Sequence, residues 1–257
     1  MLIVNADDWG IDERTTDAIV ACHRRNRVSS TSAMVFMHDS VRSAEIAREI
    51  DIDVGLHLNL TEPFASDLAP ALARDSQKAV AGFLRTGKLA GLLFHPLLHR
   101  AFRIAVAAQL DEFRRLYARD PSHIDGHHHQ HLNANVLFGG LLPAGALVRR
   151  HFTFYPGERS FLNRAYRGLS NRMLAVRCEL LDGFFDLAQY MHTPKMQRLA
   201  SAANSGDVEL MVHPAQSAEF QFLNGTEFGQ WLEGVELGEF RLLRNAPREA
   251  DAHPEQT

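Results

Sequence analysis

Apolar and polar positions in the first sixty residues follow two different repeats. Residues 2–6 (LIVNA), 31–37 (TSAMVFM) and 53–60 (DVGLHLNL) are short apolar runs, typical of buried strands. The two segments between them, 12–26 and 40–50, carry apolar side chains at helical spacing, and Asp12 and Ser40 suit the start of each helix. Strands that alternate with single helices predict a parallel sheet with right-handed crossovers, whose strands all end on one face.

The rest of the chain continues this alternation less regularly. Residues 102–120 form an amphipathic helical pattern that leads into a short strand at 122–125. Further strands are expected at 147–155 and 207–214, with a mostly helical region at 160–203 between them. Residues 61–102 are irregular and look like an insertion with short helices. A lid, an oligomer contact (and hence a homo-oligomer) or a packed excursion that completes the core would each fit that insertion.

The size and composition of the chain favour one globular domain. A length of 257 residues suits a single α/β barrel, and 46% apolar with 23% charged residues is ordinary globular usage. We therefore expect one (β/α) barrel-like domain of a distorted TIM type over residues 1–247. The polar tail, 248–257, is expected to be frayed. In such folds ligands bind at the face where the strands end.

Charge and cysteine content exclude several classes of protein. A net charge of −4 gives no basic surplus for a phosphate backbone, which argues against a nucleic-acid partner. Cys22 and Cys178 match no metal-binding or disulfide spacing and indicate reduced thiols. The chain shows no signal-peptide pattern at its start and no apolar run of the roughly 18 residues that a membrane helix needs. We expect a cytoplasmic protein without a membrane span.

Polar side chains interrupt or follow four of the predicted strands. Asp7 and Asp8 close the first strand, and alternation would let one bind a metal while its neighbour faces a water or substrate beside it. His57 lies within the apolar frame of the third strand, where a hydrogen-bonded core histidine is the ordinary interpretation. Three strand ends nevertheless supply Asp, His and His, which is the ligand set of a hydrolytic metal site with open positions.

The segment HIDGHHHQHL, residues 123–132, holds five of the fourteen histidines. If it runs extended, His127, His129 and His131 face one side and His128 the other, so that at most half can converge on one metal. A His-rich loop that binds metal weakly at several positions is the alternative, and it would not depend on Asp8 or His57.

Five motifs together resemble one family. IVNADDWG, VSSTSAMV, VGLHLNLT, HIDGHHHQHL and ELMVHP, in this order, are similar to the YdjC-like carbohydrate deacetylases. The resemblance runs from Leu2 to Pro214 and weakens through residues 61–101 and after Phe154. It implies a (β/α) barrel with a divalent metal at the face where the strands end, which hydrolyses the N-acetyl group of an amino sugar or a short N-acetylglucosamine-containing oligosaccharide or glycoconjugate.

The resemblance also implies roles for individual residues. Asp8, His57 and His127 correspond to metal ligands, and Asp7 to the general base that takes a proton from water. His213, in the MVHP motif, is the candidate acid for the leaving amine. The chain departs from the usual family pattern at Trp9 and at Asn133-Ala134, neither of which touches an expected ligand.

Two further residues have supporting roles in this hypothesis. We expect Asp125 to orient a histidine of the cluster through its ring N–H, with a cap on the following turn as the alternative. We expect His131 to contact the substrate or to support a ligand, and His128 to be solvated or structural.

The metal and the rival functions complete the prediction. One carboxylate and two histidines suit Zn²⁺, and Mg²⁺, Mn²⁺ or Co²⁺ would also fit. A barrel phosphoesterase would need more carboxylates for a second metal and a basic pocket, for which Arg149 and Arg150 are available. A non-catalytic, metal-dependent sugar-binding protein would have no need of Asp7.

Overall fold

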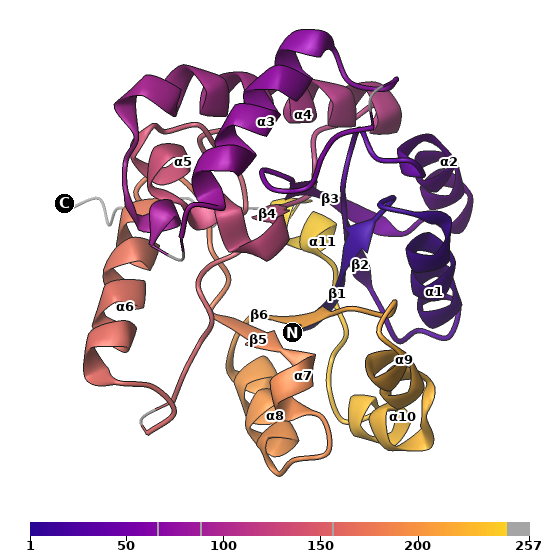
Figure 1. The fold of residues 1–257 in the computed structure, drawn as a ribbon. Helices are drawn as coiled ribbons and strands as arrows, with labels where there is room; N and C mark the ends of the chain where they lie inside the picture. The colour runs from indigo at the N-terminus through magenta and orange to yellow at the C-terminus, as the bar shows by residue number, and fades with distance from the viewer. Residues whose placement is uncertain (66, 88, 156, 246–257) are drawn as a thin grey trace, which may run out of the picture.

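The computed structural model describes residues 1–65, 67–87, 89–155 and 157–245. Its centre is a six-stranded, fully parallel sheet in the order β4-β3-β2-β1-β6-β5, which curls into a half-barrel with helices around it (Figure 1). The strands are β1 (Leu2–Trp9), β2 (Ser30–Ala33), β3 (Asp53–Leu58), β4 (Ile124–Gly126), β5 (Gly183–Asp186) and β6 (Val208–Val212). The predicted barrel-like α/β fold is confirmed.

Helices connect successive strands, as the alternating pattern requires. In the chain described, they are α1 (Glu13–His23), α2 (Ser40–Ile50), α3 (Ala71–Leu84), α4 (His99–Tyr117), α5 (Ala134–Phe138), α6 (Phe161–Ala175), α7 (Leu187–Tyr190), α8 (Lys195–Ser205), α9 (Ser217–Asn224), α10 (Thr226–Leu232) and α11 (Phe240–Asn245), with 3₁₀ turns at Ala90–Leu92, Pro96–Leu98 and His127–Leu132. The helices α1 and α2 lie along one flank of the sheet, and α3 and α4 cross above it (Figure 1). None of the described helices is both long and apolar enough to cross a membrane.

The first βαβαβ unit agrees with the sequence pattern except at the end of β2. Asp12 caps α1, because its carboxylate accepts a hydrogen bond of 2.8 Å from the Thr15 amide. The second strand ends at Ala33 and not at residue 37, because Phe36 adopts a left-handed φ of 62° and the Ser40 hydroxyl binds the Met37 amide as the chain turns into α2. The apolar residues beyond Ala33 are buried in this turn.

The prediction of a regular strand at 147–155 is wrong, and the sequence analysis missed β5. Residues 147–153 lie in the gap between β4 and β5 and bond to both sides: Ile124 N donates to Leu147 O at 2.8 Å, and Thr153 N donates to Phe184 O at 2.9 Å. Only isolated bridges form, at Leu147 and Val148. β5 has only four residues, so its pattern is too short to separate it from the helices on either side.

The insertion predicted at 61–102 contains a longer helix than expected. α3 has 14 residues and pairs with α4, and Val80 on its inner face is completely buried in the main core. This part of the insertion therefore completes the core. The segment that follows is different, since Leu89, Leu93 and Leu97 are more than half exposed. The predicted tail, 248–257, lies outside the described residues.

Candidate active site and metal centre

A bulge at the end of β1 brings both aspartates to the same place. The register with β2 shifts between Ala6 and Trp9, and Asp8 adopts a left-handed φ of 70°. Such backbone strain is typical of functional sites. The next residue but one, Gly10, has a φ of 83°, and a Cβ there would lie 2.6 Å from the Ser43 hydroxyl. The bulge, and not simple alternation, therefore sets the directions of Asp7 and Asp8.

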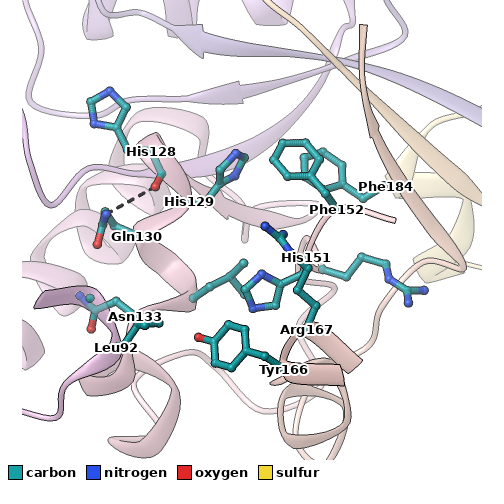
Figure 2. Close-up of a pocket in the computed structure, with 13 residues that line it drawn as sticks. Leu92, His128, His129, Gln130, Asn133, His151, Phe152, Tyr166, Arg167 and Phe184 are labelled. Carbon is teal, nitrogen blue, oxygen red and sulfur yellow. Dashed lines mark hydrogen bonds between the residues drawn. The ribbon is translucent and has the colours of Figure 1, made fainter. Parts of the chain in front are cut away.

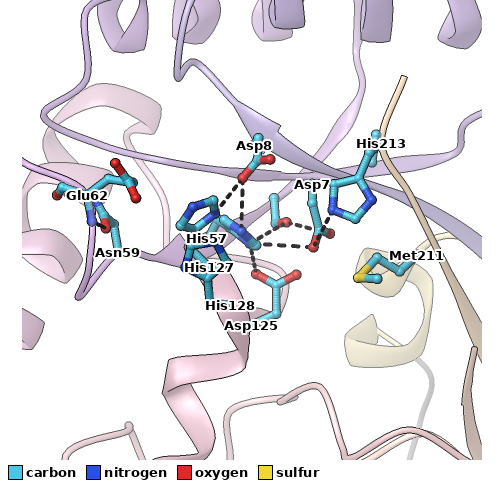
Figure 3. A network of polar contacts seen from close by, with 12 residues as sticks. Asp7, Asp8, His57, Asn59, Glu62, Asp125, His127, His128, Met211 and His213 are labelled. Atoms are coloured by element: carbon cyan, nitrogen blue, oxygen red, sulfur yellow. Dashed lines mark hydrogen bonds and ion pairs between the residues drawn. The ribbon is translucent and has the colours of Figure 1, made fainter. Parts of the chain in front are cut away.

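Asp8, His57 and His127 converge from three strand ends (Figure 3). Asp8 Oδ1 lies 3.2 Å from His57 Nε2 and 2.9 Å from His127 Nδ1, and the three candidate ligand atoms are all within 4.8 Å of one another. Burial alone would raise the pKa of the Asp8 carboxyl, but the two histidines hold it well below its usual range. A partly open carboxylate with two imidazoles is a suitable donor set for one divalent cation.

His57 is oriented from behind by Asp125. Asp125 Oδ1 lies 2.8 Å from His57 Nδ1, and the Ser32 hydroxyl lies 3.2 Å from the same nitrogen. This arrangement leaves Nε2 to face Asp8, as in the carboxylate–histidine–metal pairs of many metal sites. We expected Asp125 to orient a histidine of the 123–132 cluster, but its partner is the histidine on β3. Register explains this, because His57 and Asp125 are direct neighbours across β3 and β4.

Arg149 is a central residue that the sequence analysis missed as part of this site. Its guanidinium is fully buried and binds three carboxylates: Asp7 at 2.6 and 2.7 Å, Asp125 at 2.6 Å and Glu209 at 2.6 Å. Although burial disfavours the charge, these carboxylates keep the pKa of Arg149 well above its usual value. The available signal was a charged residue within an apolar, strand-like run, LVRRHFTFY.

Asp7 lies deeper than Asp8 and has different partners. Its side chain is almost completely buried, and Asn5 Nδ2 donates to Oδ1 at 3.1 Å in addition to the two bonds from Arg149. The second oxygen, Oδ2, also lies 4.0 Å from His57 Nδ1 and 4.0 Å from His213 Nε2. Asp7 therefore lies beside the candidate metal ligands and not among them.

His213 follows β6 (Figure 3), and Glu219 holds it in place. Glu219 accepts a hydrogen bond from the His213 backbone amide at 2.6 Å, and its other oxygen lies 3.8 Å from Nδ1. Burial opposes a charge on this ring, but Glu219 and the nearby Asp7 raise the pKa of His213 to about 9. The ring is therefore protonated at neutral pH.

The histidine cluster does not run extended. Residues 127–132 form a 3₁₀ turn in which His128 and His129 have left-handed φ values of 52° and 57°. The predicted grouping of His127, His129 and His131 on one side is therefore wrong. His131 is fully buried, and its Nε2 lies 2.9 Å from the carbonyl oxygen of Arg149, which fits a supporting contact better than contact with a substrate. His128 is exposed, with Nδ1 3.3 Å from the Thr61 hydroxyl.

Two other groups of potential ligands occur among the described residues, and both share a histidine with the first. One consists of Asp7, His57 and Asp125, and the other of Glu62, His127 and His128. In the group of Asp7, His57 and Asp125, both carboxylates are already bound by Arg149. The best-suited group is therefore Asp8, His57 and His127.

Comparison with known proteins shows the family. The model of the YdjC-like protein family matches residues 1–234, and the chain belongs to that family. It is 29% identical over 222 residues to the chitooligosaccharide deacetylase of Serratia marcescens, an alignment that covers 84% of this chain and 81% of the relative. It is 32% identical over 183 residues to the carbohydrate deacetylase of Mus musculus and 33% identical over 138 residues to the chitooligosaccharide deacetylase of Proteus mirabilis.

The last two alignments cover only part of each protein. They include 69% and 51% of this chain, and they span 57% of the mouse protein and 50% of the Proteus protein. Among solved structures, the chain resembles a protein of Enterococcus faecalis V583 that is provisionally assigned to cellobiose-phosphate cleavage. The TM-score is 0.64 at 23% identity, with 94% of this chain and 98% of the other covered. That likeness supports the fold alone.

Proposed function

We propose that this protein is a metal-dependent hydrolase that removes the N-acetyl group from an amino sugar or a short N-acetylglucosamine-containing oligosaccharide or glycoconjugate. The observation that carries the proposal is the convergence of Asp8, His57 and His127, with Asp7 and His213 beside them, at the ends of four strands. The names of the bacterial and mouse relatives support the same chemistry.

Asp8, His57 and His127 would hold one divalent cation. When bound, that cation would polarise the acetyl carbonyl and lower the pKa of a water. Zn²⁺ and Mg²⁺ are the candidates we favour, and Mn²⁺ or Co²⁺ also suit a site with one carboxylate and two imidazoles. Asp125 fixes the ring of His57 so that Nε2 faces the site.

Asp7 acts as the general base in this proposal. Its carboxylate is fixed by Arg149 and Asn5, and Oδ2 faces the side of the site where His213 lies. From there it would take the proton of the attacking water, which makes the water a better nucleophile. Because Arg149 holds both oxygens, the carboxylate does not need to reorient during the reaction.

His213 would supply the proton that the leaving amine needs. Its ring is protonated at neutral pH, and Glu219 fixes its position. The proposed acid and the proposed base are therefore close together, since His213 Nε2 and Asp7 Oδ2 are 4.0 Å apart. This pair allows protonation of the amine without a free solvent proton.

The rival functions have less support. Arg149 is saturated by three carboxylates, and Arg150 donates to the carbonyl oxygens of Leu181 and Asp182, so neither offers the phosphate pocket of a phosphoesterase. A non-catalytic sugar-binding protein would not need a base beside the ligands. A single domain over residues 1–247 and a cytoplasmic location remain part of the proposal, and the buried free thiols of Cys22 and Cys178 are consistent with that location.

Acetate release tests the proposed activity. The metal-loaded protein should release acetate from at least one member of a panel of N-acetylated mono- and oligosaccharides, and the Asp7→Asn variant should release it far more slowly. The matched control is Asp17→Asn, which removes an exposed carboxylate on α1 and should not change the rate. Acetate release by Asp7→Asn at the wild-type rate would contradict the assigned base.

A further inference from the structure

A cavity of about 330 Å³ lies against the His127–Leu132 turn (Figure 2). It is lined by residues of the His127–Leu132 turn and of α6, by residues 91–92 and 150–152, by Asn133 and by Phe184 of β5. His128 lines this cavity, and its ring lies 4.0 Å from the ring of the candidate ligand His127. The cavity and the candidate metal centre thus involve adjacent residues of the same turn.

One wall of the cavity is an aromatic platform. Phe152 stacks on Phe184 with ring centroids 4.5 Å apart and an angle of 11° between the planes. The ring of His129 lies nearly perpendicular to that of Phe152, with centroids 4.7 Å apart. Phe152 and Tyr166, whose ring lies 5.8 Å from that of His151, both line the cavity and offer apolar surface of the kind on which the C–H faces of sugar rings pack.

Arg167 gives the cavity an unneutralised positive charge. Its Nε donates to Asn163 at 2.8 Å, but no described carboxylate lies within 4.0 Å of its guanidinium, and no acidic residue lines the cavity. The guanidinium carbon lies 6.0 Å from the centre of the Phe152 ring and 5.0 Å from that of Phe154. Partial burial and the charge of Arg159 lower the pKa of Arg167, as expected for a cation that lacks an acidic partner.

The cavity lining also includes a second cation, Arg150, but its guanidinium is bonded outside the cavity lining. Arg150 points its guanidinium to the carbonyl oxygens of Leu181 and Asp182. Burial, with Arg167 and Arg150 nearby, lowers the pKa of His151 to about 4, so that its ring is neutral at pH 7. Gln130 and Asn133 add polar side chains to the lining.

We propose that this cavity binds a second sugar residue that carries a carboxylate, joined to the acetylated sugar, with its ring against Phe152 and its carboxylate on Arg167. This inference rests on the deacetylase function proposed above and adds the class of substrate. One guanidinium matches the single charge and planar shape of a carboxylate. A phosphate monoester carries roughly −1.5 to −2 charges at pH 7 and would leave part of its charge unpaired here.

Three disaccharides test the inference. In each, N-acetylglucosamine is joined to a different residue: glucuronate, glucose or glucose 6-phosphate. We expect kcat/KM for acetate release by the metal-loaded protein to be roughly 10- to 100-fold higher with glucuronate than with glucose, the usual effect of a charged hydrogen bond. Arg167→Gln should remove this preference by lowering kcat/KM for the glucuronate compound toward that for the glucose compound, while Arg167→Lys should keep part of it.

Arg172→Gln is the matched control, because Arg172 lies exposed on the same helix and does not line the cavity. It should retain the full preference. Equal rates for glucuronate and glucose in the wild type, or a preference that survives in Arg167→Gln, would overturn the inference. A higher kcat/KM for glucose 6-phosphate than for glucuronate would overturn the choice of a carboxylate. Thermal unfolding of each variant must match the wild type, and Arg167→Lys replaces Arg167→Gln if the latter is unfolded.

Calorimetric binding separates this inference from the proposed activity. If the wild type releases no acetate but binds the glucuronate disaccharide at least tenfold more tightly than Arg167→Gln does, the cavity assignment stands and the deacetylase function fails. If acetate is released from all three compounds at equal rates and Arg167→Gln binds as tightly as the wild type, the function stands and the cavity assignment fails.

Discussion

At the scale of single residues, two adjacent carboxylates have different chemical environments. Asp8 faces His57 and His127, whereas Asp7 is held by Arg149 and Asn5. The left-handed backbone of Asp8 keeps both side chains at one site, since a regular strand would point them to opposite faces of the sheet. One position can therefore bind a cation while its neighbour stays available for proton transfer.

The two aspartates should respond differently to the loss of their charge. Asp8→Asn should weaken metal affinity by roughly one to two orders of magnitude, because it removes a charged ligand. Asp7→Asn should keep a metal content close to normal but slow turnover by roughly 10²- to 10⁴-fold, the usual contribution of a general base. Metal analysis after dialysis and steady-state rates at saturating metal distinguish the two. Metal loss in Asp7→Asn with retention in Asp8→Asn would mean that the roles are exchanged.

The pH dependence of the reaction should report His213. A general acid must be protonated, so activity should fall as the pH rises through the pKa of His213, which is about 9 in the metal-free protein. A cation beside Asp7 disfavours a second positive charge and places this limb at or below that value. In His213→Asn, kcat/KM between pH 6 and 10 should be low and lack the limb. The assignment is wrong if the variant keeps the same descending limb as the wild type.

At the scale of elements, the segment 147–153 closes the gap between β4 and β5 and carries Arg149 inward. The guanidinium compensates Asp7, Asp125 and Glu209, three carboxylates from three different strands. This segment forms few regular ladder bonds, but the ion pairs of Arg149 connect it to three strands and fix its position. The stability of the fold therefore depends strongly on the side chain of Arg149.

Replacing Arg149 should therefore destabilise the protein strongly. Arg149→Met leaves buried carboxylates without compensation, and we expect the free energy of unfolding in urea to drop by roughly 3–5 kcal/mol. Addition of Glu209→Gln to this variant should recover part of the loss, because it removes one of the uncompensated groups. A change below about 1 kcal/mol in Arg149→Met would contradict the central position of this residue.

Glu209 also gives stability a pH dependence with a defined sign. Burial, which Arg149 only partly offsets, raises the pKa of this carboxyl from 4.5 to about 7. Its favourable contribution is therefore complete below pH 4.5 and is lost as the pH rises through 7. The difference in unfolding free energy between the wild type and Glu209→Gln should change across this range. A difference that stays constant from pH 4.5 to 7.5 would contradict the raised pKa.

The sequence predicts elements better than it predicts the irregular parts of the site. Apolar runs are sufficient for β1, β3 and β6, and convergence of Asp8, His57 and His127 follows from parallel strands that end on one face. The roles of these residues stay predictions. The partner of Asp125 and the position of Arg149 depend on strand register and on a non-regular segment, which local patterns do not encode. The turn at His128 and His129 likewise depends on a left-handed backbone, which a sequence pattern usually indicates by glycine, and these two positions are histidines.

At the scale of the whole molecule, the half-barrel gathers residues that are far apart in the chain. Asp8, His57, His127 and His213 come from four different strands, yet they lie close together where these strands end (Figure 3). The His127–Leu132 turn contributes both to this centre and to the neighbouring cavity. The same turn would thus contribute to both substrate selection and catalysis.

The most direct test of the central claim is metal-dependent acetate release. The protein is stripped with a chelator, Zn²⁺ or Mg²⁺ is titrated back, and acetate release from a substrate of the panel is measured at each step. We expect the stripped protein to be inactive and its activity to saturate at one metal ion per chain, with His57→Ala failing to recover and His128→Ala recovering. Full acetate release by the stripped protein, or full recovery of His57→Ala, would contradict a metal-dependent deacetylase built on Asp8, His57 and His127.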